Sequence, residues 1–225
     1  DNDFDMTIIL TKCSTALVKQ TVSRMTSEFD CFRNGNATVG EVVAQDILEI
    51  DFRSCETMED KENAVKKFLR RYKGKKRIIV VKKQADNVDR LNLFIEAIVK
   101  YEYYKRLLIV DDEADITSIG YEKFKGQEQL SLRRISGAIN KMRKSLHSQI
   151  EHVLMQVTAT PYALYLQPEN FSNNNIMPIK PLRTVVLPTG KGYIGGDFYF
   201  IESEDAQSEN YSKAKHLLHI VSQEE

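Results

Sequence analysis

The chain has 225 residues, and its 32 lysines and arginines balance 32 aspartates and glutamates, so the formal net charge is zero. Hydrophobic residues make up 42% and charged residues 28%, as in a globular protein with a buried core. No apolar run approaches the ~20 residues that span a bilayer, and the three scattered cysteines lack the spacing of metal ligands or a disulfide scaffold. We therefore expect a cytoplasmic protein without a membrane partner, in which any nucleic-acid surface is a local patch.

Short apolar runs alternate with amphipathic stretches along the chain. The runs predict buried strands at residues 6–10, 47–52, 78–81, 107–110, 153–157 and 184–187. Helical spacing of apolar residues predicts helices at 17–29, 58–72, 88–101 and 130–146. Ser14-Thr15 and Thr57 are the expected N-caps of the first two helices. This alternation predicts a three-layer α/β domain around a mostly parallel sheet.

Two stretches depart from the alternation. Residues 167–181 are rich in asparagine and proline and predict a surface loop. From Glu202 the chain is polar and acidic, and residues 214–221 have the pattern of a helix. We expect one domain over residues 1–201 and a polar, helical extension over 202–225. The first residue is not methionine, and we expect the chain to be a piece of a longer protein.

An acidic motif, Asp111-Asp112-Glu113-Ala114-Asp115, follows the predicted strand at 107–110 directly. The carboxyl edge of a parallel sheet is where ligands of open α/β sheets bind. Carboxylates there can hold Mg²⁺, usually through water, and a neighbouring glutamate can orient and deprotonate an attacking water. The alternative is an acidic N-cap for the next helix, and the strand context favours the functional interpretation.

A threonine motif, Thr158-Ala159-Thr160-Pro161, follows the next predicted strand along the chain. Two hydroxyl groups at a strand end can donate hydrogen bonds to a carboxylate on a neighbouring strand. Threonine and proline often close strands, so the motif alone is a weak signal. Its pairing with the acidic motif at matching strand ends makes the signal strong.

These motifs carry a resemblance to a known family. The order LLIVDDEAD, a helix, then a strand that ends TATP resembles the first motor lobe of superfamily 2 helicases and translocases, which has a RecA-like fold. A narrower resemblance is to the Z-one domain group of bacterial proteins, described as endonucleases with an ATPase core. It lies in QTVSR (20–24), DDEAD (111–115), TATPYA (158–163) and YIGGDFYF (193–200), and the resemblance as a whole covers roughly residues 5–201.

The resemblance implies an ATP hydrolase that uses ATP and Mg²⁺. Asp112 and Glu113 become the catalytic pair, in which Asp112 holds Mg²⁺ through water and Glu113 activates the attacking water. Asp111 is an extra carboxylate, so the register of the motif can shift by one. We prefer Asp112-Glu113 because it gives the full DEAD string.

The resemblance also assigns a coupling role to three residues of the two motifs. Asp115 is expected to accept a hydrogen bond from Thr158 or Thr160, and the threonine motif couples nucleotide state to movement in that family. The resemblance further implies a nucleic-acid partner, and we expect DNA rather than RNA.

Candidate nucleic-acid contacts come from two segments. Leu10-Thr11-Lys12 followed by 17–20 resembles the family's segment that touches the nucleic-acid backbone, which implicates Thr11, Lys12 and Gln20. Residues 66–83 contain ten lysines and arginines and no acid. For residues 66–77 a solvated helix end is an equally good interpretation. Lys82 and Lys83 follow a strand on the same edge as the acidic motif and are the better candidates.

The phosphate-binding part of such a motor is missing. The sequence contains no G-x-x-x-x-G-K-[ST] loop, and the second motor lobe with its arginine finger is absent too. We therefore expect these residues to be part of a DNA helicase or translocase, of the kind found in bacterial restriction or defence systems. We expect the chain to be inactive without the P-loop segment and second lobe of the same polypeptide. A nuclease subunit and a non-catalytic nucleic-acid-binding module are the alternatives, although no nuclease centre of clustered carboxylates beside a lysine is visible.

Overall fold

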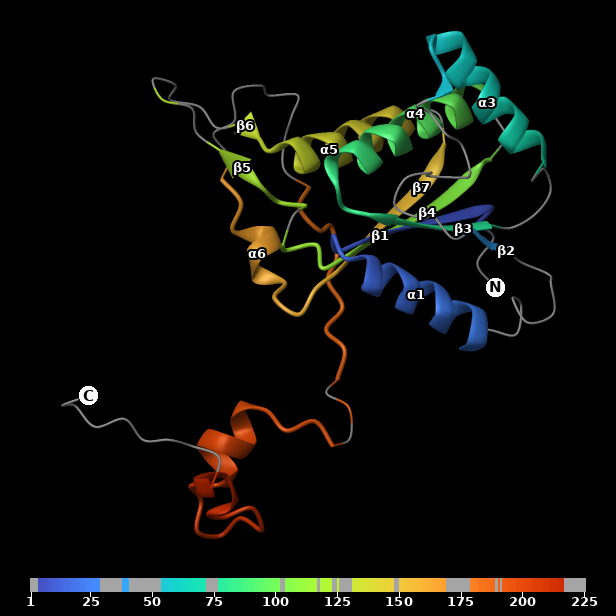
Figure 1. The fold of residues 1–225 in the computed structure, drawn as a ribbon. Helices are drawn as coiled ribbons and strands as arrows, with labels where there is room; N and C mark the ends of the chain where they lie inside the picture. Colours follow the sequence, from blue (N-terminus) through green and yellow to red (C-terminus); the bar gives the residue numbers. More distant parts are fainter. Residues whose placement is uncertain are drawn as a thin grey trace. The chain divides into compact units, whose positions relative to one another are not determined.

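The computed structural model of the chain divides into two compact units, Asp1–Leu182 and Arg183–Glu225. It describes residues 4–28, 38–40, 54–71, 77–101, 104–116, 118–122, 125, 131–147, 150–168, 179–188, 190 and 192–216. The first unit is a mixed α/β domain that contains the sheet and both motifs (Figure 1).

A parallel sheet forms the centre of the first unit. Its strands are β1 (Met6–Thr11), β2 (Thr38–Gly40), β3 (Arg77–Lys82), β4 (Arg106–Asp112) and β7 (Glu151–Val157). They lie in the order β2-β3-β1-β4-β7, and every neighbouring pair is parallel. The four long strands confirm four of the predicted runs, whereas β2 has only three residues and was not predicted.

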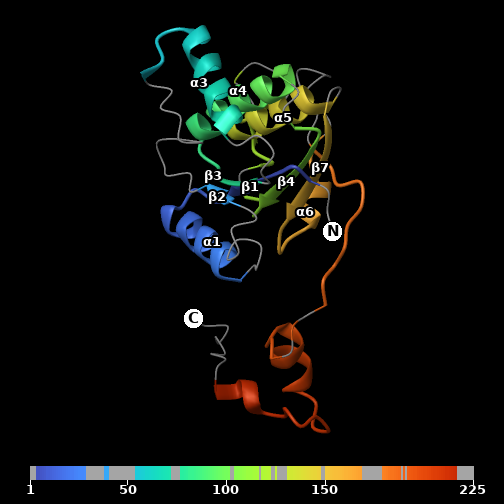
Figure 2. The same cartoon turned by 90° about the vertical axis from the view of Figure 1, so that its right-hand side faces the viewer.

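Helices cover both faces of this sheet (Figures 1 and 2). One face packs against α4 (Ala85–Tyr101) and α5 (Arg134–His147), with α3 (Met58–Arg71) beside α4. The other face packs against α1 (Thr15–Glu28). The prediction of an α/β fold with a parallel sheet and helices on both of its faces is therefore confirmed.

Alternating residues of the strands supply two hydrophobic clusters, because successive side chains point to opposite faces. Ile8 and Leu10 of β1 belong to the larger cluster with α4 and α5, and Ile9 belongs to the smaller cluster under α1. In the larger cluster, Phe68 of α3 meets Phe94 of α4 edge to face, with ring centroids 5.6 Å apart. The β1, β3 and β4 strands are thus held from both sides.

Several predicted elements differ from the structure. Residues 184–187 do not form a strand, and the side chains of Val185, Val186 and Leu187 are 70–82% exposed. A short apolar run becomes a strand only where a neighbouring strand accepts its hydrogen bonds.

The α5 helix begins at Arg134, not 130, because Ser131–Leu132 (β6) pairs with Tyr121–Glu122 (β5). A short helix, α6 (Tyr162–Tyr165), follows the threonine motif. The predicted strand at 47–52 lies outside the described residues, as does most of the predicted loop at 167–181.

The second unit begins before the predicted boundary at residue 201. It holds a π-helical turn, η3 (Phe198–Glu202), and a 3₁₀ turn, η4 (Lys213–His216). The two turns are joined through Ser203, whose hydroxyl accepts the Ala214 N–H at 2.9 Å and whose carbonyl accepts the Ser212 N–H at 2.8 Å. Residues 198–202 therefore belong with the segment that follows them. The predicted tail helix is described only as far as η4.

Among the helices that the structure describes, none is both long and apolar enough to cross a bilayer.

The α3 helix begins with a reciprocal cap. The Thr57 hydroxyl accepts the Asp60 N–H at 3.1 Å, and the Asp60 carboxylate accepts the Thr57 N–H at 3.0 Å and its hydroxyl at 2.7 Å. These bonds confirm Thr57 as the N-cap, and the hydrogen bonds from Thr57 lower the pKa of Asp60. Ser14 caps α1 more loosely, with its Oγ 3.4 Å from the Leu17 nitrogen.

We predict that Thr57→Ala lowers the free energy of unfolding by about 1 kcal/mol, because it removes the N-cap hydroxyl of α3. Asn63→Ala, an exposed substitution within the same helix, serves as the control and leaves stability unchanged or slightly raised. Urea unfolding followed by circular dichroism measures both. Equal midpoints for the two variants would contradict the capping role.

Candidate active site

The acidic and threonine motifs lie side by side at the carboxyl edge of the sheet. Asp112 at the end of β4 is paired in register with Val157 at the end of β7, so the two motifs leave neighbouring strands at the same level. The Ala114 N–H donates to the Val157 carbonyl at 3.1 Å and joins the acidic loop to β7 beyond the last strand pair. The structure thus places together the two motifs that the sequence separates by more than forty residues.

Asp115 accepts hydrogen bonds from both threonines of the second motif. Thr158 Oγ1 lies 2.6 Å from Asp115 Oδ1, and Thr160 Oγ1 lies 2.5 Å from Asp115 Oδ2. The Thr158 hydroxyl also accepts the Thr160 N–H at 2.9 Å, which fixes the two hydroxyls relative to each other. The predicted contact between Asp115 and this motif is confirmed, and it is bidentate.

The charge state of Asp115 depends on these bonds. Burial alone would raise the pKa of Asp115, but the hydrogen bonds from Thr158 and Thr160 outweigh it and lower the pKa below the usual value. The ionised carboxylate can accept from both hydroxyls at once, which is the form that the observed geometry requires.

Asp111 and Asp112 point to opposite faces of the sheet. Asp111 follows Leu107 and Ile109 on the α4 and α5 face and is 1% exposed, whereas Asp112 is half-buried on the α1 face. The Asp111 carboxylate forms an ion pair with Lys83 at 3.1 Å and accepts a hydrogen bond from the Ser118 hydroxyl at 2.8 Å. Burial raises the pKa of Asp111, and Lys83 and Ser118 oppose that rise. The Asp111 carboxylate is therefore bound inside the domain, and Asp112 and Glu113 are the two residues next to it whose acidic side chains solvent or a ligand can reach.

Glu113 has an unusual backbone. Its φ is 53°, in the left-handed region that residues other than glycine rarely adopt. The Glu113 carbonyl accepts the Ile116 N–H at 3.2 Å and closes a tight turn, and its side chain is exposed. A conformation of this kind costs on the order of 1 kcal/mol and persists where surrounding bonds hold it.

Two of the predicted nucleic-acid contacts are buried. Lys83 is 1% exposed, and its ammonium group faces Asp111, the carbonyls of Asp112 and Glu113, and Ser118. Thr11 is also 1% exposed at the end of β1. Neither side chain can reach the phosphates of a nucleic acid on the surface. The prediction that Lys83 and Thr11 bind nucleic acid is therefore corrected.

The other three predicted contacts lie near the beginning of α1. Lys12 and Gln20 are exposed, and Lys82 Nζ lies 3.3 Å from Thr15 Oγ1 in the first turn of α1. A helix N-terminus and two lysines provide the partial and full positive charges that attract phosphate oxygens. Of the basic run, residues 72–76 lie outside the described part of the chain.

The accessible carboxylates fit Mg²⁺ in one particular way. Among the described residues, Asp112 and Glu113 have no ion-pair partner, and no three histidine, cysteine or acidic side chains are grouped to hold a metal. Mg²⁺ is commonly bound by one or two carboxylates together with waters and substrate phosphates. Asp112 could supply such a carboxylate to a Mg²⁺ that is also bound by nucleotide phosphates. The described side chains do not form a complete metal site by themselves.

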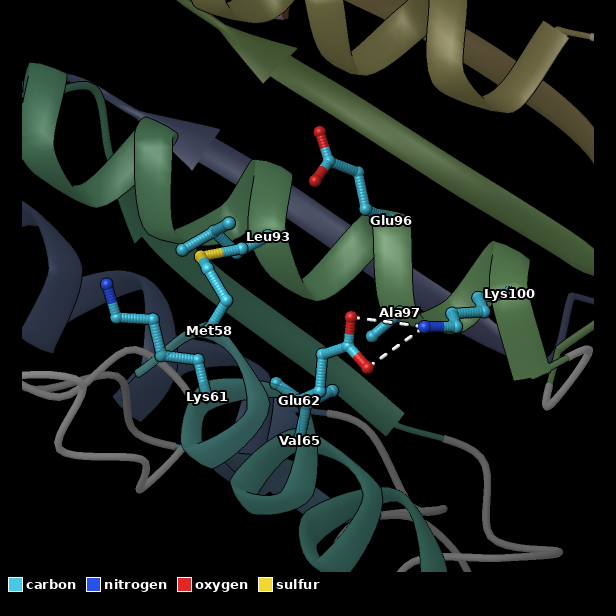
Figure 3. Close-up of a pocket in the computed structure, with 8 residues that line it drawn as sticks. All are labelled: Met58, Lys61, Glu62, Val65, Leu93, Glu96, Ala97 and Lys100. Carbon is cyan, nitrogen blue, oxygen red and sulfur yellow. Dashed lines mark hydrogen bonds and ion pairs between the residues drawn. The ribbon is translucent and has the colours of Figure 1, made fainter. Parts of the chain in front are cut away.

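A small pocket lies elsewhere, between α3 and α4 (Figure 3). Its volume of about 60 Å³ is far below the ~300 Å³ of the smallest typical ligand sites. Glu62 and Lys100 form an ion pair across it at 2.9 Å. The pocket includes no residue of either motif, and the pair joins the two helices. We assign it no role in binding.

The pairing of Lys83 with Asp111 was not predicted, although the sequence contained a signal for it. Both residues continue the inward alternation of their strands, Lys83 after Ile79 and Val81, and Asp111 after Leu107 and Ile109. A lysine and an aspartate that continue the buried faces of two strands at the same edge of a sheet are expected to pair, because an unpaired buried charge is very costly. Ser118, the other donor to Asp111, carried no such signal.

Comparisons with protein-family models, with curated proteins and with solved structures find no match to the chain. The resemblance to helicase motor lobes therefore rests on the motifs and their geometry.

We predict that Thr158→Val raises the pKa of Asp115, because the variant removes one of the two bonds that favour its charged form. In the wild type, the lowered pKa adds stability that is present above the unfolded pKa and lost as pH falls through the folded pKa. The variant should lose less stability over that acidic range. Carboxyl NMR titration measures the shift, and Thr21→Val on α1, which leaves both hydroxyls in place, is the control. An unshifted Asp115 in the Thr158 variant would contradict the assignment.

Proposed function

We propose that the first unit is the RecA-like motor lobe of an ATP-dependent DNA helicase or translocase, of the kind that serves bacterial restriction or defence systems. The observation that carries the proposal is the bidentate contact of Asp115 with Thr158 and Thr160, beside the accessible pair Asp112 and Glu113. Because the Asp115 carboxylate is bound by two hydroxyls that directly follow β7, the acidic loop is linked to the end of β7 in a defined geometry.

The proposed roles of the side chains are those that the family resemblance implies, and their positions support them. Asp112 would hold Mg²⁺ through its water shell, and that metal would supply neutralisation of charge on the transferred phosphate. Glu113, exposed beside it, orients the attacking water and accepts its proton. Asp115 transmits any shift of this loop to Thr158 and Thr160, and so to the segment that follows β7.

The phosphate cradle has to come from a segment that is not among these residues, since the sequence contains no P-loop. The β7 strand ends the sheet order and leaves one edge unpaired among the described residues. Its Val153, Met155 and Val157 are 42–47% exposed on the face that also presents Asp112. We propose that a P-loop strand and its helix cover this edge and face in the full-length protein, which brings the phosphates to Asp112 and Glu113.

A nuclease function is less well supported. One carboxylate, that of Asp111, does pair with a lysine at the sheet edge, whereas Lys83 meets Asp112 and Glu113 only at their main-chain carbonyls. The lysine is buried, however, and its three protons face four protein oxygens, so none is left for a water or a scissile phosphate. A non-catalytic module would keep the same geometry without turnover.

We predict that Glu113→Gln in the full-length protein abolishes DNA-stimulated ATP hydrolysis while leaving the fold intact, because the amide cannot accept the proton of the attacking water. Glu122→Gln, at an exposed glutamate of β5, is the matched control and retains turnover. Release of phosphate with and without DNA measures both. Equal turnover by the wild type and Glu113→Gln would refute the catalytic assignment.

We predict that replacing Lys12 and Lys82 by alanine weakens DNA binding and makes the salt dependence of the binding constant shallower. The slope should fall by about one for each lysine that no longer neutralises a phosphate. Lys141→Ala is the control, because that lysine is engaged with Glu96 at 2.9 Å on the α4 and α5 side of the sheet. Fluorescence anisotropy over a series of salt concentrations measures the slope. The same slope in the Lys12/Lys82 variant and in the control would show that α1 does not touch the DNA.

A further inference from the structure

Lys83 is the most deeply buried charged side chain near the candidate site. It follows β3, and its main-chain N–H donates to the Thr11 carbonyl at the end of β1 at 2.8 Å. Because β1 lies between β3 and β4 in the sheet, the Lys83 side chain spans the end of β1 to reach the acidic loop after β4. Thr11, whose carbonyl accepts the Lys83 N–H, is 1% exposed.

The ammonium group of Lys83 binds more than the Asp111 carboxylate. It donates to the carbonyl oxygens of Asp112 and Glu113, the latter at 2.8 Å, and the Ser118 hydroxyl lies 3.3 Å away. Two of its partners are therefore main-chain carbonyls of the two residues assigned to catalysis. A lysine that only neutralised Asp111 would need neither of them.

These two contacts determine how the acidic loop is turned. With the carbonyls of Asp112 and Glu113 directed inward to Lys83, the Glu113 side chain is exposed and Asp112 is accessible on the opposite face from Asp111. The left-handed φ of 53° at Glu113 lies within this turn. On its far side the loop is held by the Ala114 N–H, which donates to Val157.

We propose that Lys83 is a positioning residue, which fixes the backbone of Asp112 and Glu113 so that their carboxylates face the nucleotide. This inference rests on the proposed ATPase function for its catalytic consequence, whereas its structural part concerns the 225-residue chain alone. The competing explanation is that Lys83 merely compensates the buried charge of Asp111.

Three variants separate the two explanations. Lys83→Met removes the ammonium, Asp111→Asn keeps it but removes the carboxylate charge, and the double variant removes both charges. Lys100→Met is the control, because Lys100 also pairs with a carboxylate, Glu62, but on the surface. The reporter is the Ala114 amide, whose hydrogen bond to Val157 depends on the position of the loop.

We expect hydrogen exchange of the Ala114 amide, measured by NMR on the 225-residue chain, to be roughly ten- to a hundredfold faster in Lys83→Met and in the double variant. Asp111→Asn and Lys100→Met should exchange like the wild type. If Lys83 only compensates charge, the double variant regains wild-type protection. That recovery, or reduced protection in Asp111→Asn, would overturn the proposal, and the double variant still decides if Lys83→Met alone fails to fold.

In the full-length protein, we expect the double variant to lower kcat for ATP about a hundredfold with KM little changed, since the loop is misplaced while the phosphate cradle is intact. Wild-type kcat in the double variant would overturn the positioning role. If the wild type itself does not hydrolyse ATP, the proposed function fails, and the exchange of the Ala114 amide still tests the placement of the loop by Lys83.

Discussion

Parallel pairing of β3, β1, β4 and β7 is the constraint on which the site depends. It brings the carboxyl ends of four strands to one edge, so that residues far apart in the sequence meet there without a long loop. Lys83 follows β3, the acidic motif ends β4, and the threonine motif follows β7. Each of these segments is anchored to a different strand, and their hydrogen bonds tie the strand ends together.

Two sets of bonds hold the acidic loop from opposite sides. Lys83 binds Asp111 and the carbonyls of the next two residues from the interior, while Thr158 and Thr160 bind Asp115 from β7. Buried ion pairs gain little net stability, because desolvation offsets the Coulomb attraction. The buried position of Lys83 is better explained by the conformation that its bonds to the two carbonyls impose on the loop than by the stability of its ion pair with Asp111.

The parts of this structure that depend on local pattern could be predicted from the sequence. Continuous apolar runs predicted β1, β3, β4 and β7, because strands buried on both faces leave that signature. Two polar motifs at neighbouring strand ends predicted a bond between the threonines and a carboxylate, and the resemblance to helicase motor lobes named Asp115 as that carboxylate. The exposed run at 184–187 has the same signature, but it lies in a unit where it pairs with no strand among the described residues.

Residue type alone could not predict that Lys82 and Lys83 would differ in burial and in binding partners. The two are adjacent and chemically identical, yet Lys82 reaches Thr15 at the start of α1, whereas Lys83 is buried against the acidic loop. Strand alternation separates them, and it becomes informative only once the buried face is known. The extra carboxylate in the acidic motif has the same explanation, since Asp111 turns inward to the lysine and leaves Asp112 and Glu113 accessible.

A crystal structure of the full-length protein with a non-hydrolysable ATP analogue and Mg²⁺ tests the proposed site most directly. We predict that the metal-bound waters contact the Asp112 carboxylate, that the Glu113 carboxylate faces the γ-phosphate, and that the phosphate cradle packs against β7. A nucleotide bound away from the carboxyl ends of β4 and β7 would contradict the proposed ATPase site.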